Sequence, residues 1–300
     1  MRAYIPGIYP RSDALVQATR DLDRDRTTPE EVDARFAADL EELVTAQQDA
    51  GLDLLADGML RWQDLFRPLV EAAEGLEAGP LTRFLDTNTF FRAPHATAAR
   101  PKLEAPLDER YVAPLTGPRV VTLPSPYAFS RGTDLTATAF AKGVLKPQIE
   151  ALDAELVVLS EPFLAREDKP DLDEVASALE TLEDGPALAL QLTFGDARTA
   201  LEHGIADLPI EGIGIDFYAT RVKDIPVGMG KRLLAGVVDA RSSALEDPET
   251  LAGFAARLDA RGIAEIDLVP NGDLHFVAEG IARQKLFRLA RARSGMRVWS

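Results

Sequence analysis

Two side chains near the end of the sequence, Asp273 and His275, have types and a spacing that could do chemistry. They lie in the segment "VPNGDLHFV", directly after the apolar run "AEIDL". Alternation along an extended segment points residues two positions apart to the same side. The pair could therefore act as acid and base at a site. His275 could instead be buried in a turn, and both interpretations stay open here.

The other two histidines carry weaker signals. His95 lies in a proline-rich stretch and is predicted to be at the surface, and His203 precedes Gly204 at a predicted helix end, where it favours the helix dipole. The chain has no cysteine, which excludes disulfides, thiolate nucleophiles and cysteine-containing zinc sites. A metal site made of His275, Asp273 and Glu161 is the remaining alternative. We predict no metal bound by this chain.

Short apolar runs alternate with longer helical patterns along the chain, which predicts parallel strands joined by helices. The predicted strands are residues 3–8, 53–56, 119–123, 156–159, 187–192, 212–215, 233–238 and 265–269. Eight strands close a (β/α)₈ TIM barrel. We therefore predict an α/β fold in which residues 1–300 form one TIM-barrel domain.

Capping residues mark the helices between these strands. The first long helix is predicted to follow the cap Thr28, with Pro29 at its first position, and to end at Gly51. Two later helices repeat the pattern, with caps at Asp171 and Asp247 and terminal glycines Gly185 and Gly262.

Residues 59–117, between the second and third predicted strands, do not fit the alternation. The segment has a β-rich start that includes "RFLDTNTFF", followed by a Pro/Ala-rich middle. This pattern predicts an inserted hairpin or arm outside the barrel. Long insertions often act as lids or binding loops, although a solvated excursion has the same composition.

Polar residues follow the predicted strands at their carboxyl ends, where (β/α)₈ barrels carry their chemistry. The predicted catalytic residues are Glu161, Asp239, Asp273 and His275. The predicted substrate-binding residues at this rim are Tyr9, Arg11, Asp57, Asp216, Arg241 and Asn271. Clustered carboxylates raise one another's pKa, so some could act as acids or bases near neutral pH. Each could instead cap a helix or pair with an arginine.

Charge and motifs exclude several classes of protein. The net charge of −16 argues against a nucleic-acid partner, because phosphate binding needs a basic surface. No run of 18 apolar residues predicts a membrane span, and the first residues lack the apolar segment of a secretory signal. No P-loop, GxGxxG after a strand, GxSxG or HExxH motif occurs. We predict a cytoplasmic protein that acts on a small molecule.

Five motifs, in order along the chain, resemble the cobalamin-independent methionine synthase family. They are "YPRS" with Arg11, "RFLDTNTFF" with Asp86, Thr87 and Asn88, "LSEPFL" with Glu161 and Pro162, "LLAGVVDARS", and "LVPNGDLHFV". Enzymes of that family have two (β/α)₈ barrels, similar to those of uroporphyrinogen decarboxylase, and the carboxyl-terminal barrel is catalytic. This chain resembles the amino-terminal barrel. The resemblance adds Asp86 and Asn88 to the predicted substrate-binding residues.

The chain also departs from the family pattern. The family's catalytic barrel holds zinc through a His-x-Cys pair after strand five, a cysteine after strand eight and a glutamate. In this chain the positions of the His-x-Cys pair fall near Gln191 and Thr193, and the position of the later cysteine falls near Gly272. The catalytic barrel of the family also has a histidine that acts as a proton donor, and its position falls at Arg241. Zinc stabilises the thiolate of homocysteine. The resemblance therefore implies that the standard zinc site is missing from this chain.

Methyl transfer is the activity that the resemblance implies, from a donor such as methyltetrahydrofolate to a thiol such as homocysteine. An enzyme of this kind is a 5-methyltetrahydropteroyltriglutamate–homocysteine methyltransferase, which this chain resembles. This chain would bind the donor, and a separate zinc-bearing barrel would supply the activated sulfur. A polyglutamate tail on a folate needs cations, for which the candidates are Arg11, Arg92, Arg131 and Arg241.

Two alternatives remain open from the sequence. The first is a zinc-independent enzyme in which Glu161, Asp239 and Asp273 supply acid and base groups, while Arg11 or Arg241 binds a substrate carboxylate. The second is a non-catalytic barrel that stabilises a catalytic partner, because a fold does not fix a function. Whether the chain is itself an enzyme is therefore left open at this stage.

Overall fold

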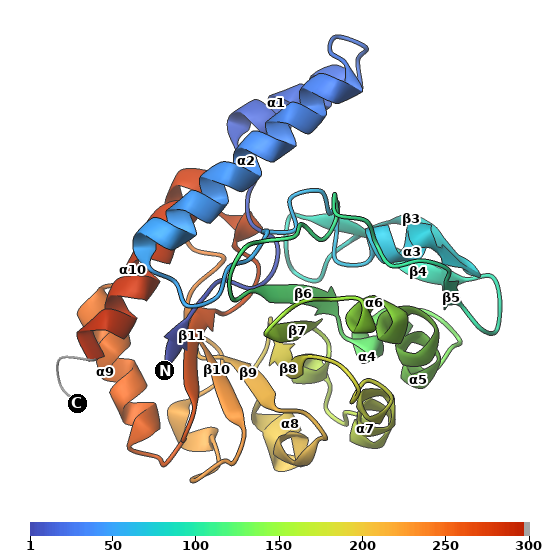
Figure 1. Ribbon diagram of the computed structural model, residues 1–300. Helices are drawn as coiled ribbons and strands as arrows, with labels where there is room; N and C mark the ends of the chain where they lie inside the picture. Colours follow the sequence, from blue (N-terminus) through green and yellow to red (C-terminus); the bar gives the residue numbers. More distant parts are fainter. Residues whose placement is uncertain (297–300) are drawn as a thin grey trace.

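Parallel strands form the centre of the computed structural model, which describes residues 1–296 (Figure 1). Seven strands are hydrogen-bonded in the order β1-β11-β10-β9-β8-β7-β6, and every pairing in this sheet is parallel. They are β1 (Arg2–Ala3), β6 (Val120–Pro124), β7 (Leu156–Glu161), β8 (Ala187–Leu192), β9 (Gly212–Asp216), β10 (Arg232–Val238) and β11 (Ile266–Pro270). Their side chains are almost all buried, as expected for apolar strands covered on both faces.

Residues 53–56 complete the ring between β1 and β6. The Asp53 amide donates to the Ala3 carbonyl at 2.9 Å, and the Leu55 carbonyl accepts from the Val120 amide at 2.9 Å. Leu55 forms a parallel bridge with Arg119. The predicted α/β barrel is confirmed, although its second strand is reduced to this bridge.

The first strand is shorter than predicted, because the sequence interrupts it after Ile5. Pro6 has no amide hydrogen to donate to a neighbouring strand. Gly7 has a φ of +83°, a left-handed conformation that glycine adopts readily, and its amide donates to Thr122 Oγ1 at 2.8 Å. The chain therefore turns at this point, and the following residues reach the carboxyl end of the barrel.

The α-helices surround this sheet. They are α1 (Asp13–Leu22), α2 (Pro29–Ala50), α3 (Arg67–Ala72), α4 (Pro126–Ser130), α5 (Ala137–Phe140), α6 (Lys146–Glu150), α7 (Leu172–Glu180), α8 (Arg198–Glu202), α9 (Pro248–Asp259) and α10 (Glu279–Met296). A π-helical turn at Ala141–Leu145 joins α5 to α6, and single 3₁₀ turns lie at Leu164–Arg166, Ile205–Asp207, Val222–Asp224 and Leu274–Phe276.

Capping residues begin the helices where the sequence predicts them. Thr28 accepts from the Glu31 amide at the start of α2, which ends at the left-handed Gly51. Asp171 and Asp247 cap α7 and α9 in the same way. The prediction that α7 ends at a glycine is wrong. The helix ends at Glu180. The amide of its C-cap, Thr181, donates to the Ala178 and Leu179 carbonyls, four positions before Gly185.

The inserted segment contains a β-hairpin that lies outside the barrel sheet. Its strands β3 (Leu76–Arg83) and β4 (Phe90–Ala96) pair antiparallel, and β2 (Ala73–Glu74) pairs with β5 (Lys102–Leu103). Figure 1 shows the hairpin beside β6, with α3 next to it. A hairpin is thus present within residues 59–117. The boundaries of this insertion, and of one domain over residues 1–300, stay predictions.

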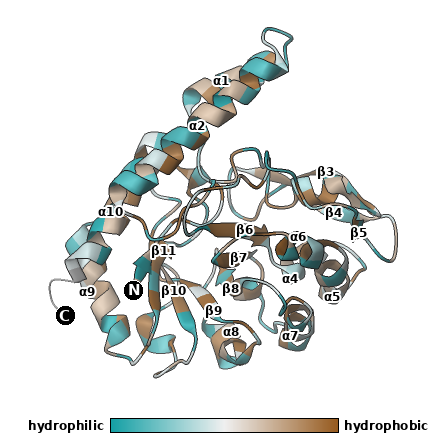
Figure 2. Ribbon diagram, in the orientation of Figure 1, coloured by the Kyte–Doolittle hydropathy of each residue, from teal (hydrophilic) through white to brown (hydrophobic). Residues whose placement is uncertain are grey.

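Helices α1 and α2 form an antiparallel pair whose far end projects away from the sheet (Figure 1). The second half of α2 packs against α10. In Figure 2 the central strands are largely hydrophobic, whereas much of the surface of α1 and α2 is hydrophilic. No helix within residues 1–296 is long and apolar enough to cross a membrane.

A buried carboxylate ties together the amino ends of three barrel strands. Asp267 of β11 accepts from Arg2 Nη2 at 2.8 Å, from Arg232 Nη1 at 3.2 Å and from the Tyr4 hydroxyl at 3.0 Å. The Asp267 side chain is fully buried, while both guanidinium groups keep some contact with solvent. The cluster lies at the end of the barrel opposite the candidate active site.

Candidate active site

A cavity of about 510 Å³ lies at the carboxyl ends of β1 and β11. Its walls come from residues 8–13 after β1, residues 62–65, hairpin residues 84 and 89–91, and the segment between β11 and α10. Four of the predicted site residues line it together, namely Tyr9, Arg11, Asp273 and His275. They come from opposite ends of the sequence, and the β1–β11 pairing brings them side by side.

Asp273 and His275 are fixed to the loop after β1. Asp273 Oδ1 accepts from the Ile8 amide at 2.9 Å, and the His275 amide donates to the Ile8 carbonyl at 3.0 Å. Burial raises the pKa of Asp273, an effect that nearby His275 and the Ile8 amide oppose. Burial lowers the pKa of His275, with Asp273 opposing and Arg11 adding to the effect.

His275 is consequently neutral at pH 7 and able to accept a proton. Its Nδ1 atom is buried, and within residues 1–296 it has no hydrogen-bond partner. A buried polar atom without a partner is costly, and His275 is also one of the residues that line the cavity. The pair His275–Asp273 therefore has the composition of a base supported by a carboxylate.

Arg11 is the one guanidinium among the described residues that line the cavity. Its Nε donates to the Leu60 carbonyl at 2.7 Å and its Nη2 to the Trp62 carbonyl at 3.2 Å. Burial lowers the pKa of Arg11, although a guanidinium stays protonated at neutral pH. The group is thus held by two backbone oxygens, which leaves fewer of its hydrogens for a ligand.

Aromatic side chains form much of the remaining wall. Trp62 is buried and its indole nitrogen donates to the Tyr111 carbonyl at 2.9 Å. Phe84 and Phe91 of the hairpin stack edge to face at 5.3 Å, and Phe90 is 54% exposed. The motif "RFLDTNTFF" drew attention to Asp86 and Asn88 at the hairpin tip, whereas its three phenylalanines and Thr89 are the residues that line the cavity.

Asp64 is a second cavity residue that the sequence analysis missed. One of its oxygens accepts from the Phe66 and Arg67 amides at 2.8 and 2.9 Å, and the other accepts from the Arg92 amide at 3.1 Å. Asp64 therefore joins the start of α3 to the hairpin. The signal available in the sequence was the position of Asp64, two and three residues before the amides of Phe66 and Arg67 at the start of α3.

Asp216, Arg241, Asp239 and Asn271 form a separate cluster at the ends of β9, β10 and β11. Asp216 accepts from Asn271 Nδ2 at 2.9 Å and pairs with Arg241 at 3.3 Å, while Asp239 lies 3.8 Å from the same guanidinium. Burial raises the pKa of Asp216, and its hydrogen bond to Asn271 opposes this. These four predicted residues are partnered with one another and do not line the 510 Å³ cavity.

Three phenylalanines cover this second cluster. Phe194 stacks edge to face on Phe84 at 5.7 Å and on Phe276 at 5.6 Å, and Arg241 lies 5.4 Å from the Phe194 ring. The space that Phe194 and Phe276 enclose with Asn271 and Arg241 is too small for a water molecule. We call Phe84, Phe194 and Phe276 the aromatic seal, because Phe194 stacks on both of the others beside this space.

The hairpin tip is held across this mouth. Asp86 pairs with Arg166 at 2.8 Å, and Arg166 Nη1 also donates to the Phe194 carbonyl at 3.2 Å. Asn88 Oδ1 accepts from Arg83 at 3.2 Å within the hairpin itself. The structure thus places Asp86 and Asn88 outside the cavity lining, where they fix the tip to the barrel.

Glu161 and Asp57 stabilise turns after their strands. Glu161 is fully buried and accepts from the Phe163 and Leu164 amides at 2.8 and 3.1 Å and from the Ser125 hydroxyl. Burial raises the pKa of Glu161 to about 7. Asp57 accepts from two backbone amides at 2.9 and 3.0 Å, and burial raises its pKa as well. Neither side chain lines the cavity.

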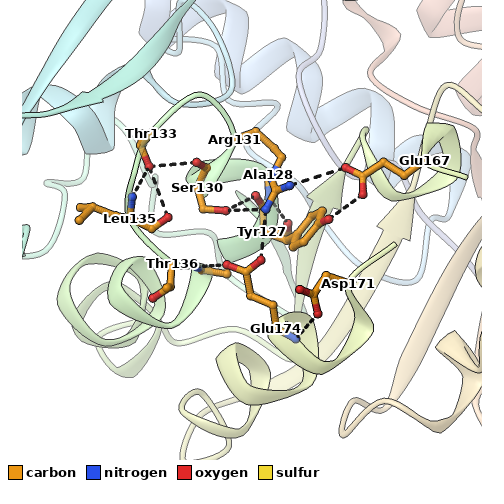
Figure 3. Close-up of polar contacts among 12 residues, drawn as sticks. Tyr127, Ala128, Ser130, Arg131, Thr133, Leu135, Thr136, Glu167, Asp171 and Glu174 are labelled. Carbon is orange, nitrogen blue, oxygen red and sulfur yellow. Dashed lines mark hydrogen bonds and ion pairs between the residues drawn. The ribbon is translucent and has the colours of Figure 1, made fainter. Parts of the chain in front are cut away.

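The arginines proposed for a polyglutamate tail do not converge. Arg92 donates to the Gly79 carbonyl at 2.9 Å. Figure 3 shows Arg131 between Tyr127 and two glutamates: its guanidinium lies 3.9 Å from the Tyr127 ring, 3.2 Å from Glu174 and 3.8 Å from Glu167. The Tyr127 hydroxyl donates to Glu167 at 2.7 Å and completes this group.

The positions that the resemblance relates to zinc ligands lie together, but their side chains do not fit zinc. A Cβ atom built on Gly272 would lie 3.8 Å from Thr193 Cγ2, and Gln191 Nε2 donates to the Pro270 carbonyl at 3.0 Å. Thr193 Oγ1 is buried and unpartnered within the described chain. Zinc sites use thiolate, imidazole and carboxylate ligands. Residues 1–296 contain no group of three His, Cys, Asp or Glu placed to hold a metal.

Gly7→Ala is expected to lower stability and to displace Asp273. A Cβ atom on Gly7 would lie 2.1 Å from Asp273 Oδ1, and the φ of +83° costs about 1–2 kcal/mol for a residue with a side chain. Urea unfolding should therefore give a decrease of at least this size. Gly253→Ala is the matched control, because Gly253 lies inside α9 with open space around it and alanine should stabilise the helix. Equal effects of both changes would contradict this account of Gly7.

Comparison with known proteins finds similarity to one family over part of the chain. Residues 136–261 match the model of the "Cobalamin-independent synthase, N-terminal domain". The 5-methyltetrahydropteroyltriglutamate–homocysteine methyltransferase of Mycobacterium tuberculosis is 37% identical over 112 residues, 35% of this chain and 15% of that protein. The protein of that name from Corynebacterium glutamicum is 27% identical over 219 residues, 69% of this chain and 29% of that protein.

Solved structures share the fold over almost the whole chain. A B12-independent methionine synthase from Shewanella sp. W3-18-1, in complex with selenomethionine, superposes with a TM-score of 0.73 at 17% identity and covers 91% of both chains. A putative vitamin-B12 independent methionine synthase from Listeria monocytogenes gives 0.75 at 15% identity, covering 100% of this chain and 98% of that one. The chain spans less than a third of the length of the curated relatives it matches. Over residues 136–261 it is therefore similar to the amino-terminal domain of cobalamin-independent synthases.

Proposed function

We propose that the 510 Å³ cavity is the methyl-donor site of a methyltransferase that acts on a thiol such as homocysteine. The observation that carries the proposal is the position of the cavity, at the carboxyl ends of β1 and β11, with His275 and Asp273 in its wall. Barrel enzymes carry their chemistry at this end. The names of the relatives supply the reaction type, and a small molecule is the partner that a cavity of this size accommodates.

The acceptor thiol has to be converted to a thiolate before it can attack a methyl group. Because residues 1–296 offer no zinc ligand set, a zinc-activated thiolate would come from a separate zinc-bearing barrel. Such a partner would place its thiolate against the donor in this cavity. In this form of the proposal the chain supplies donor binding and orientation, which are worth several kcal/mol of the barrier.

A second candidate, a methyltransferase that works without zinc, is favoured by the unpartnered Nδ1 of His275. A neutral imidazole can take the proton of a thiol bound beside it, and Asp273 favours the imidazolium that forms. Arg11 adds a positive charge near the thiolate. Glu161, Asp239 and Asp216 are engaged in other contacts and remain outside this proposed chemistry.

Methyl transfer to homocysteine, measured with the purified chain and a donor carrying a labelled methyl group, tests the proposal. The assay is run with the chain alone, with added zinc-bearing barrel from a cobalamin-independent synthase, and with a zinc chelator. Product from the chain alone, insensitive to chelator, supports the second candidate. Product only with the added barrel, above the rate of that barrel by itself, supports the first. No product from the chain alone, together with no gain over the rate of the added barrel by itself, overturns the proposed function.

A further inference from the structure

We propose that the donor is a small methyl-onium cation, either a methylsulfonium or a quaternary methylammonium, rather than a polyglutamylated folate. The inference rests on the proposed function and names the substrate class of the same cavity. Its basis is the combination of an aromatic wall with an excess of carboxylates around one site.

The aromatic wall has the composition that binds quaternary cations. Five aromatic side chains line the cavity, namely Tyr9, Trp62, Phe84, Phe90 and Phe91. An aromatic face attracts a cation within about 6 Å of its centroid, and cages of several rings recognise methylated ammonium groups. Onium methyl groups are apolar and cannot donate strong hydrogen bonds, so rings suit them better than polar side chains do.

The charges around the cavity also favour a cation. Four carboxyl side chains line it, namely Asp13, Asp64, Asp273 and Glu279, against the guanidinium of Arg11. Asp64 is engaged by three backbone amides, and Arg11 by two backbone carbonyls. Asp273 and Glu279 thus give this partly buried site an excess of carboxylates. Charges interact more strongly in such a site than in water.

A polyglutamate tail would meet the opposite conditions. It carries several carboxylates, which need a row of cations. Among the arginines considered for that role, Arg92 and Arg131 are bound to hairpin and helix partners, and Arg241 pairs with Asp216 beneath the aromatic seal. None of these three lines the cavity. Repulsion from Asp273 and Glu279 would oppose such a tail.

An onium donor also gives a balanced transfer step. The thiolate sulfur attacks the methyl carbon and forms the new carbon–sulfur bond. The bond from that carbon to the sulfonium sulfur or ammonium nitrogen breaks, and its electron pair stays on the departing atom. The positive and negative charges cancel, so the products leave as a thioether and a neutral thioether or amine. The thiol proton is taken beforehand by His275, whereas a zinc-bearing partner barrel, where one supplies the acceptor, would deliver it already as a thiolate.

Calorimetric titration of the full chain with tetramethylammonium and trimethylsulfonium tests the inference, with neopentyl alcohol as a neutral probe of similar shape. Both cations are expected to bind more tightly than the alcohol. Phe90→Leu keeps an apolar side chain but removes the ring, and should weaken cation binding about 2- to 5-fold without affecting the alcohol. Glu279→Gln should also weaken only the cations. Phe287→Leu is the control, because this exposed phenylalanine of α10 does not line the cavity.

The outcomes separate the donor class from the proposed function. Equal binding of cation and alcohol, or an equal loss of both in Phe90→Leu, overturns the onium inference. Binding and turnover of 5-methyltetrahydrofolate without any response to the cations overturns it too, while the proposed methyl transfer stands. Transfer from a methylsulfonium or quaternary methylammonium donor, with none from the folate, supports it. Failure of every donor both to bind and to react removes the proposed function itself.

Discussion

His275→Asn is expected to lower the rate of methyl transfer by the chain alone about 10²- to 10⁴-fold, the usual range for loss of a general base. Asparagine cannot take a proton from a thiol at neutral pH. Asparagine is smaller than histidine but keeps a polar group near the position of Nδ1, an atom that has no partner to lose within residues 1–296. The rate constant kcat, measured with saturating donor and thiol, reports the effect, and the affinity for the donor should change little.

The pH profile of the same reaction identifies the group that titrates. A base must be unprotonated, so the rate should fall as the pH drops through the pKa of His275, which burial places below its ordinary value. Asp273 raises that pKa, and Asp273→Asn should therefore move this limb of the profile to lower pH. The control is His203→Asn, because His203 contacts the Thr199 carbonyl at the end of α8, far from the cavity lining.

A rate within a few-fold of the parent in His275→Asn, with the acidic limb unchanged, would show that His275 is not the base. If the parent chain alone is inactive, the same variant is assayed with the added zinc-bearing barrel. Full activity in that mixture would leave donor binding as the contribution of this chain.

Asp267→Ala is expected to lower the free energy of unfolding by about 3–5 kcal/mol, the range seen when one partner of a buried ion pair is removed. The substitution leaves Arg2 and Arg232 without their shared carboxylate and the Tyr4 hydroxyl without its acceptor. These residues belong to β1, β10 and β11, so the loss acts where the barrel ring joins its first and last strands. Urea unfolding followed by far-ultraviolet circular dichroism measures the change.

Asp108→Ala is the matched control for this prediction. Asp108 pairs with Arg110 at 2.7 Å, but both side chains are more than half exposed, and exposed pairs contribute about 0–1 kcal/mol. If Asp267→Ala does not fold, Asp267→Asn keeps the shape and can be measured in its place. A loss below about 1 kcal/mol in the Asp267 variant that folds would mean that Glu155 and Glu265, which already pair with Arg2 and Arg232, are sufficient partners for the arginines.

Local sequence signals predicted the elements that depend on neighbouring residues. Thr28, Pro29 and Gly51 determine where α2 begins and ends, because capping acts within one turn. The strand positions followed from apolar runs that the barrel buries. Predictions were less accurate where long-range contacts decide. The bridge at Leu55 and the short β1 depend on how the ring closes, which no single segment specifies.

The candidate site was predictable only in part, for the same reason. Tyr9, Arg11, Asp273 and His275 follow strands directly, so the barrel rule placed them near one another. Trp62 and the phenylalanines of the hairpin contribute through the path of an insertion of about sixty residues, which the sequence does not reveal. Polar residues drew attention as candidates, yet Glu161 and Asp216 have their hydrogen-bonding capacity used within the protein. Only the folded geometry distinguishes such satisfied groups from Nδ1 of His275.

The aromatic seal has a consequence for redesign of this barrel. Among the positions that the resemblance relates to zinc ligands, Gly272 lines a space with Phe194 and Phe276 that is too small for water, and Thr193 lies next to Gly272. A catalytic zinc needs an open coordination position and a route for substrate, whereas a closed one is structural. Grafting the ligands alone would thus create an inert metal centre. An engineered zinc enzyme on this scaffold also requires trimming of the hairpin tip that Arg166 holds in place.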